Sequence, residues 1–419
     1  MDTPKRQHKP KLDTYEKNNM KKLTSAFIIL LSVCFVQPVL ADENDIRDQL
    51  NPVYTAVTPL TIAPDARAGG MGDVGVATNS DMNAQYWNSS KYAQNESSAG
   101  FAFSYTPWLR KLGVNDINLL YLAGYYTPSK MAGTISASLR FFQLGEVLLR
   151  ESADAIPLSA NPYEMTFDLG YSRMLTENFS LGVVMRLVAS DLTAKTDPNY
   201  YTGYAFGADV NGFYSLPIEM KSGTSRFNFG FNISNIGTRI TYDKGDNYNF
   251  IPANLRLGVG YQIPFDKYNR LLISLEANKM MVPSRYSKVA KYNPDFDATN
   301  MDTWAMTTEE YNKISSMEGL IMSWYDAPGG FAEEMAEINW GIGLEYAYNE
   351  QFFGRLGYNN EAKDKGNRKY FTVGAGFKLS AFKLDVGYVI ATSASNPLDQ
   401  TLRFSLAFDI DGIKALADK

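Results

Sequence analysis

Residues 226–236 read R-F-N-F-G-F-N-I-S-N-I, an alternation of large apolar and small polar side chains. In a β-strand, successive side chains point to opposite faces, so this spacing gathers the phenylalanines on one face and the asparagines on the other. A helix would scatter the same residues around its circumference. We therefore expect a strand here, with Phe229 toward lipid and Asn228 toward a polar interior.

The same alternation recurs along nearly the whole chain after residue 98. About fourteen such segments lie at 99–107, 115–127, 131–145, 164–175, 177–191, 202–215, 226–236, 253–264, 270–279, 336–349, 351–360, 369–379, 381–391 and 399–410. Most are longer than the about 5–6 residues of a globular strand, and they match the about 9–11 residues of a tilted membrane-spanning strand. The sequence therefore predicts an all-β fold, an about 14-stranded antiparallel transmembrane β-barrel over 98–410, followed by a tail at 411–419.

The polar faces of these segments carry charges of both signs, as in a wet or plugged lumen. They include Arg140, Asp168, Arg186, Asp209, Arg256, Glu276, Glu345, Arg355 and Asp385. A large soluble β-sandwich or propeller is the alternative, but no repeat of propeller length is visible. The barrel is therefore the favoured fold.

The links between segments are mostly tight on one side and longer on the other, as in outer-membrane barrels. The link at 216–225 is an exception, since it is fairly long on the tight side. We expect the long links, including an insertion at 280–335, to face the cell exterior.

The insertion contains one predicted helix, at 307–321. Thr307 and Glu310 have the spacing of a capping box. One face of this helix would carry Tyr311, Ile314, Met317 and Ile321. The insertion also contains Trp304, Trp324 and Tyr325, and these aromatic side chains need a cover. Packing on the barrel rim and binding to a partner are equally favoured. Glu333, Glu334 and Glu337, at its exit, are typical of a solvated charged face.

Residues 1–41 are predicted to be a leader, with a signal peptide that begins at Met20. Two lysines precede an apolar run over 23–36, and Val39 and Ala41 occupy the −3 and −1 positions of a cleavage site. A retained N-terminal anchor is the alternative, but the run is too short to span a membrane as a helix.

Removal of the leader takes away His8 and Cys34, the only histidine and the only cysteine. The remaining chain has no thiolate nucleophile, no Ser-His-Asp relay and no imidazole or thiolate metal site. Its net charge is −9, because seven of the 40 Lys/Arg and three of the 45 Asp/Glu lie in 1–41. Such a chain is unsuited to nucleic acid. We therefore predict no catalytic, cofactor-binding or metal-binding residues.

Residues 42–97 lack the strand pattern and are rich in Gly, Asn, Asp and Ser. Gly70-Met71-Gly72-Asp73-Val74-Gly75 has the letters of a dinucleotide-binding loop, but neither the preceding strand nor the following helix that such a loop needs. We predict instead a hatch inside the barrel. In it, Gly70 and Gly72 hold positive φ or allow a close backbone approach.

The stretch 66–90 resembles the N-terminal hatch motif of FadL-like outer-membrane proteins. The matching positions are Ala66, Arg67, Gly70, Met71, Gly72, Val76, Ala77, Tyr86, Trp87 and Asn88, whereas Ser89-Ser90 stands where the motif has Pro-Ala. Within that superfamily, the opening N-P-V-Y-T-A-V-T-P-L-T-I-A-P-D-A-R-A-G-G-M-G-D at 51–73, which ends on Asp73, is similar to that of the PorV proteins of the type IX secretion system.

The resemblance implies a non-enzymatic outer-membrane protein that binds the C-terminal signal domains of cargo leaving the translocon channel (SprA/Sov-like). It implies transfer of this cargo to the PorU sortase with PorQ and PorZ, which attach it to lipopolysaccharide. A link of such proteins to lipid A deacylation gains no support from a chain without His or Cys. The FadL likeness implies the alternative, uptake of hydrophobic small molecules. For the first function we expect Trp304, Tyr311, Trp324 and Tyr325 to contact cargo or partners.

Overall fold

The computed structural model describes residues 51–129, 132–149, 157–192, 200–243, 245, 247–392 and 396–417. The predicted leader and the first residues of the predicted hatch lie outside the described residues. Within these ranges, no helix combines the length and the apolar character needed to cross a membrane.

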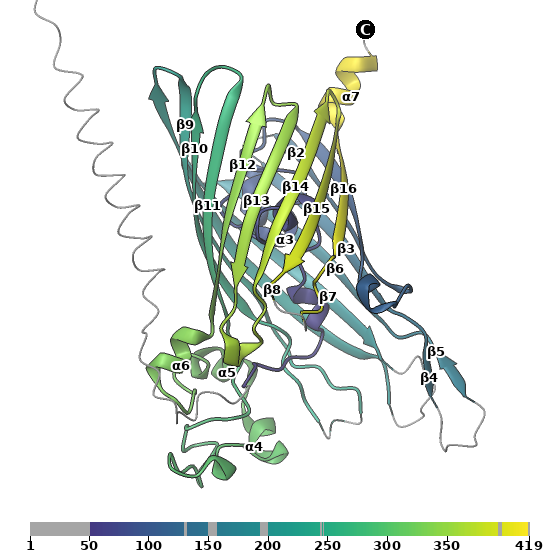
Figure 1. Ribbon diagram of the computed structural model, residues 1–419, viewed down its shortest axis with the longest axis vertical. Helices are drawn as coiled ribbons and strands as arrows, with labels where there is room; N and C mark the ends of the chain where they lie inside the picture. Colours follow the sequence, from purple (N-terminus) through teal and green to yellow (C-terminus); the bar gives the residue numbers. More distant parts are fainter. Residues whose placement is uncertain are drawn as a thin grey trace, which may run out of the picture. The chain divides into compact units, whose positions relative to one another are not determined.

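Fourteen antiparallel strands close into one barrel, in the order β1-β16-β15-β14-β13-β12-β11-β10-β9-β8-β7-β6-β3-β2 (Figure 1). Their bounds are β1 Ala99–Pro107, β2 Ile117–Ser129, β3 Gly133–Leu144, β6 Tyr163–Met174, β7 Phe179–Asp191, β8 Gly203–Met220, β9 Gly223–Gly237, β10 Asn254–Pro264, β11 Asn269–Met280, β12 Ile338–Tyr348, β13 Phe352–Asn360, β14 Tyr370–Leu379, β15 Phe382–Ala391 and β16 Leu402–Asp409. β4 Val147–Leu149 and β5 Leu158–Ala160 pair separately, in the link between β3 and β6. The predicted fold class is confirmed.

The alternation in the sequence separates the outer face of the barrel from its lumen. On β9, Phe229 is 40% exposed whereas Asn228 is fully buried. All nine charged strand residues named above are buried in the lumen. Many of them form ion pairs there; Arg186, for example, bonds both Asp168 and Asp209. These pairs explain how a largely filled lumen holds charges of both signs.

The two ends of the barrel differ in the length of their links. The turns at one end are short, including the link between β8 and β9, where Pro217 pairs with Arg226 and only 221–222 remain outside the strands. The prediction of a fairly long link at 216–225 was therefore wrong: both strands extend further than their alternating pattern indicates. Figure 1 shows α7 (Ile410–Ala417) at this end and the insertion at the opposite, long-loop end.

Residues 51–97, called the hatch from here on, contain the short helices η2 (Thr58–Thr61), α2 (Ala66–Gly69), α3 (Ala84–Trp87) and η3 (Ser89–Gln94). Figure 1 shows α3 enclosed by the strands. Most hatch residues from 63 to 77 and from 84 to 93 are buried. The polar lumen is therefore occupied by chain rather than by an open channel.

The insertion contains η5 (Met301–Thr303), α4 (Thr308–Lys313), α5 (Ser316–Met322) and α6 (Phe331–Ala336); η4 (Arg110–Leu112) and η6 (Lys363–Lys365) lie in other long loops. The predicted capping box at the start of α4 is present. The single predicted helix at 307–321 is wrong, because Ile314 is extended with ψ of 118° and Ser315 caps a new helix. The break turns Ile314 inward, while Met317 and Ile321 remain exposed.

Candidate functional site

The turn that follows α2 lies against the barrel wall. Gly72 has a φ of 73°, and a Cβ added to it would lie 2.7 Å from the carbonyl oxygen of Tyr358. Gly70 has an ordinary φ of −81°, but its Cβ would lie 2.9 Å from the Cα of Gly374. Gly72 therefore needs glycine for its conformation and for the close approach, and Gly70 for the approach alone. Between them, Met71 is 1% exposed.

Arg67 joins the hatch to the lumenal charges. Its guanidinium forms a two-pronged ion pair with Glu345 of β12, at 2.8 and 3.0 Å, and donates to Asp81 at 2.6 Å. Burial opposes the charge, but Glu345 and then Asp81 raise the pKa of Arg67 well above its usual value. Glu345 also accepts from Arg355, so the hatch arginine enters a network of wall residues. Loss of one member would leave a buried charge without its partner.

The remaining motif residues also form hatch contacts. Asp73 accepts from Tyr370 at 2.6 Å and pairs with Arg403 at 2.5 Å. The indole of Trp87 donates to Asp65 at 2.6 Å. Asn88 is fully buried and donates to the carbonyl of Gly212 at 2.9 Å. Each of the following motif residues is therefore packed or hydrogen-bonded within the hatch or against the barrel wall: Arg67, Gly70, Met71, Gly72, Asp73, Trp87 and Asn88.

Sequence reasoning missed several residues that complete this arrangement. Asp65 caps α2 by accepting from Ala68 N, in addition to the Trp87 bond. Glu276 accepts from the backbone N–H groups of both Gly75 and Val76, at 2.8 and 2.9 Å. Glu276 is recognisable in the sequence as a lumenal charge, but nothing there indicates its partners. The dinucleotide reading of 70–75 is excluded too, since no helix follows Gly75.

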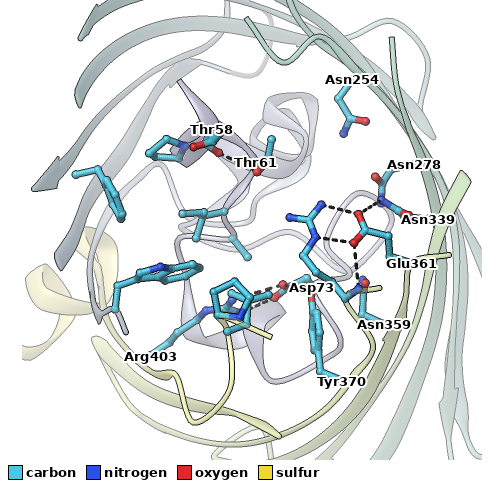
Figure 2. A pocket seen from close by; sticks show the side chains of 18 of the residues that line it. Thr58, Thr61, Asp73, Asn254, Asn278, Asn339, Asn359, Glu361, Tyr370 and Arg403 are labelled. Carbon is cyan, nitrogen blue, oxygen red and sulfur yellow. Dashed lines mark hydrogen bonds and ion pairs between the residues drawn. The ribbon is translucent and has the colours of Figure 1, made fainter. Parts of the chain in front are cut away.

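Two cavities lie on either side of the hatch, and no residue lines both. The cavity at the short-turn end has a volume of about 610 Å³ and is lined by charged residues that include Arg226, Arg270 and Lys378. The cavity at the long-loop end has a volume of about 350 Å³. Figure 2 shows this second cavity, with Asn254, Asn278, Asn339 and Asn359 along one wall. The hatch therefore divides the lumen.

The insertion presents apolar side chains to its surroundings. Met317 and Ile321 lie one turn apart on α5, and Phe331 and Met335 one turn apart on α6. Their exposed fractions reach 64% at Ile321 and 77% at Phe331. We call the following set the rim patch: Met317, Ile321, Trp324, Tyr325, Phe331 and Met335.

The four predicted partner residues do not share one surface. Trp324 and Tyr325 belong to the rim patch and are 44% and 50% exposed. Tyr311 is only 3% exposed, because its ring packs against Phe250 inside the core of the insertion. Trp304 is half-buried and donates to the carbonyl of Asp297. Of the four candidate partner residues, Tyr311 is therefore packed inside the insertion, and its described contacts are structural.

The acidic residues at the exit of the insertion are not a solvated face, and that prediction was wrong. Glu334 and Glu337 are 4% and 7% exposed, and both pair with Lys279 of β11, at 3.0 and 2.5 Å. Lys365 pairs with Glu333 at 2.6 Å and with Glu337 at 3.1 Å. These ion pairs attach α6 to the barrel rim.

Asp326 lies beside this charge cluster. Its carboxylate accepts from Ser284 N at 2.8 Å and is 1% exposed. Burial is the main cause that raises the pKa of Asp326 to about 8. The bond from Ser284 N lowers this pKa, the negative charges of Glu337 and Glu334 raise it, and the positive charge of Lys279 lowers it. This part of the insertion therefore contains a carboxyl group that titrates near neutral pH.

The family model of the type IX secretion system protein PorV matches residues 45–287. Among solved structures, a TodX mutant described as a monoaromatic hydrocarbon channel is 13% identical, with a TM-score of 0.46 over 82% of this chain and 98% of that one. The Pseudomonas putida toluene transporter TodX is 11% identical, with a TM-score of 0.46 over 86% and 99%. A Pseudomonas aeruginosa FadL homologue is 10% identical, with a TM-score of 0.40 over 86% and 99%. No curated protein matches the chain. Because the PorV model covers more than half of the sequence, this chain belongs to the PorV family of the type IX secretion system, whose barrel lies in the outer membrane.

Proposed function

We propose that this PorV family member binds the C-terminal signal domains of cargo leaving the type IX translocon and carries them to the cell-surface sortase and attachment complex. PorV proteins are a non-enzymatic family, so binding and release are the whole of the proposed activity. The observation that carries the proposal is the rim patch, which is exposed on α5, on the turn that follows it and on α6, at the long-loop end.

The rim patch has the composition of a binding surface. Large aromatic and methionine side chains are enriched in protein interfaces, and central ones contribute about 2 kcal/mol or more each. A barrel wall needs none of these side chains, because they lie outside it, on α5, on α6 and in the turn that follows α5. Six large apolar side chains exposed in one insertion outside the membrane favour a site that another molecule covers.

The rim patch lies on a well-packed part of the insertion, and this packing favours a role in binding. Tyr311, Ile314 and Met322 form a buried core with Met281 and Phe250 under the insertion. Lys279 lies 5.5 Å from the ring centre of Trp324 and bonds Glu334 of α6. A surface held in its bound shape loses less conformational entropy when a partner docks.

The orientation follows from the same proposal: the long-loop end faces the exterior, where cargo emerges, and the short turns face the periplasm. Uptake of hydrophobic compounds, the competing function, needs a path past the hatch. The two cavities share no lining residue, and the buried pair of Arg67 and Glu345 holds the hatch between them. Passage would require displacement of this network, so the shuttle is favoured.

The test is a patch variant in which Ile321, Tyr325 and Phe331 are changed to Ser. These three side chains are half or more exposed, so the barrel should still assemble. A matched control changes Leu148 and Leu158 to Ser; both are more than half exposed and belong to the separate β4–β5 hairpin. Assembly is checked by heat-modifiable migration, and binding by co-purification of cargo signal domains from intact membranes.

We expect the patch variant to lose at least tenfold in captured signal domain while the hairpin control retains wild-type capture. Wild-type capture by an assembled patch variant would refute the role of the rim patch. Equal losses in both variants would show that the effect is general to the rim and would also refute the assignment.

A further inference from the structure

The cavity at the long-loop end has two chemically different walls (Figure 2). One wall is apolar and contains Trp108 and Phe142, whose rings meet edge to face at 6.3 Å, together with Leu398 of the β15–β16 loop. The other wall consists of side chains from β10 to β13, which are polar except for Met280. A ligand of this cavity must therefore have one apolar face and one edge rich in hydrogen-bonding groups.

The polar wall contains a ladder of asparagines on four adjacent strands. Asn278 of β11 is directly opposite Asn339 of β12. On β10, Asn254 lies two residues from Arg256, which is opposite Asn278. On β13, Asn359 is opposite Gly341, which lies two residues from Asn339. Lumen-facing side chains in such register are neighbours.

Two of these asparagines, Asn278 and Asn339, have unused hydrogen-bonding groups within the described part of the chain. The carboxamide of Asn278 has no hydrogen-bond partner there. The Oδ1 of Asn339 is buried without a partner, while its amide donates weakly to Glu361 at 3.4 Å. A buried polar atom without a partner is costly, so a ligand that supplies a partner for Asn339 Oδ1 gains affinity from it. The half-buried Asn278 offers a further donor and acceptor.

The charged residues of the cavity are already neutralised by one another. Arg403 pairs with Asp73, Arg368 bonds Glu361 at 2.6 and 2.8 Å, and Arg256 pairs with Glu276 at 3.0 Å. The groups left for a ligand are neutral carboxamides, each of which both donates and accepts. Hydroxyl groups have the same double capacity, whereas a carboxylate or phosphate would find no unpaired cation.

We propose that this cavity binds one end of a neutral saccharide. The C–H face of the sugar ring lies against Trp108 and Phe142, and its hydroxyl edge bonds Asn278 and Asn339. A volume of about 350 Å³ is at the lower end of small-molecule sites and suits a mono- or disaccharide. A plain hydrocarbon would leave both asparagines buried and unpaired, at a cost in affinity. This site is separate from the rim patch, so it does not depend on the proposed cargo binding.

The test is calorimetric titration of the assembled barrel in a detergent without a sugar headgroup, since a maltoside would compete. The probes are glucose, galactose, mannose and N-acetylglucosamine, with glucuronate as the charged control and toluene as the apolar control. Core oligosaccharide released from lipopolysaccharide forms a further arm. Tighter binding of the oligosaccharide than of any monosaccharide assigns a glycan end, and the reverse assigns a free sugar.

We expect at least one neutral saccharide to bind with a 1:1 stoichiometry and more tightly than glucuronate or toluene. Asn278→Ala and Asn339→Ala should each weaken this binding by roughly 2- to 12-fold, the range for a single hydrogen bond. Asn115→Ala, in an exposed loop at the same end, is the matched control and should bind as wild type. Trp108→Leu tests the apolar wall independently and should also weaken binding.

Binding of toluene in the absence of any saccharide binding would overturn the proposal, as would equal binding of glucuronate. Wild-type affinity in both asparagine variants, with heat-modifiable migration retained, would overturn it as well.

Discussion

Replacement of Gly357 by alanine tests how closely the hatch fits the barrel wall. Gly357 lies on the lumenal face of β13, and a Cβ added to it would overlap Gly72 N and Met71 C and lie 2.7 Å from Gly72 Cα. All three are backbone atoms, so no side-chain rotation relieves the overlap. The hatch turn must move away from the strand.

The magnitude follows from what the movement breaks. Overpacking of a fitted core costs about 1–3 kcal/mol. The movement also strains the bond from Gly72 N to Thr372 Oγ1, 2.8 Å, and the bond from Asn359 to the Gly72 carbonyl, 3.1 Å. A buried donor left unpaired costs a further ~1–3 kcal/mol. We expect the free energy of hatch opening to fall by about 3 kcal/mol, which corresponds to roughly a hundredfold.

The assay is hydrogen–deuterium exchange of peptides from 51–97 in the assembled barrel. Gly354→Ala on the same strand is the control, because its Cβ would meet nothing within 4 Å on the outer face. Gly357→Ala should accelerate exchange in the hatch by roughly a hundredfold, whereas Gly354→Ala should leave it unchanged. Identical exchange in the two variants, with the barrel folded in both, would refute the close fit between hatch and wall.

Three further predictions concern other parts of the molecule. Phe229→Arg should lower the free energy of barrel unfolding in lipid by about 2–4 kcal/mol if the residue lies near the bilayer midplane, whereas Phe229→Leu should cost little; equal refolding titrations would contradict its lipid exposure. The pKa of Asp326 is raised to about 8, so its stabilising contribution is complete below about pH 4 and lost as pH rises through 8. Proteolysis of the insertion should accelerate over that window after correction for protease activity, and Asp326→Asn should flatten the profile; a profile unchanged by this substitution would assign the pH dependence elsewhere. Lys365→Met leaves two buried carboxylates short of a partner and should loosen α6 by about 3 kcal/mol in exchange experiments, while the exposed Lys414→Met should change stability by less than about 0.5 kcal/mol; equal exchange in these two variants would contradict the structural role of the buried cluster.

The barrel could be predicted because the residue pattern that specifies each strand lies within a short stretch of sequence. A period of two in the sequence places alternate residues on opposite faces, and membrane thickness sets the length of the strands. Near a turn the alternation weakens, and the end of a strand is then not marked in the sequence. Leu216 and Pro217, for example, follow each other at the end of β8 without the clear pattern of its middle, yet the backbone pairing continues to Met220.

The contacts of the site are not local, and this limits what the sequence alone tells. Arg67 and Glu345 are 278 positions apart, and no spacing rule joins them. The sequence also does not show which residues of the insertion are buried. Tyr311 and Tyr325 are both aromatic residues of the insertion, yet Tyr311 is 3% exposed and Tyr325 is 50% exposed. Likewise, Glu334 has the sequence context of a surface residue, and only the position of Lys279 explains its burial.

The contact between hatch and wall joins segments that are synthesised at different times. The hatch is synthesised before any strand, but Ala66 N donates to Ser405 Oγ of β16, at 2.8 Å. The same hydroxyl lies 2.6 Å from Ser104 of β1, across the pairing that closes the barrel. The hatch, which emerges before every strand, can therefore complete this hydrogen bond only when the last strand has arrived. Until then, the backbone N–H group of Ala66 must remain solvated or be protected by another protein.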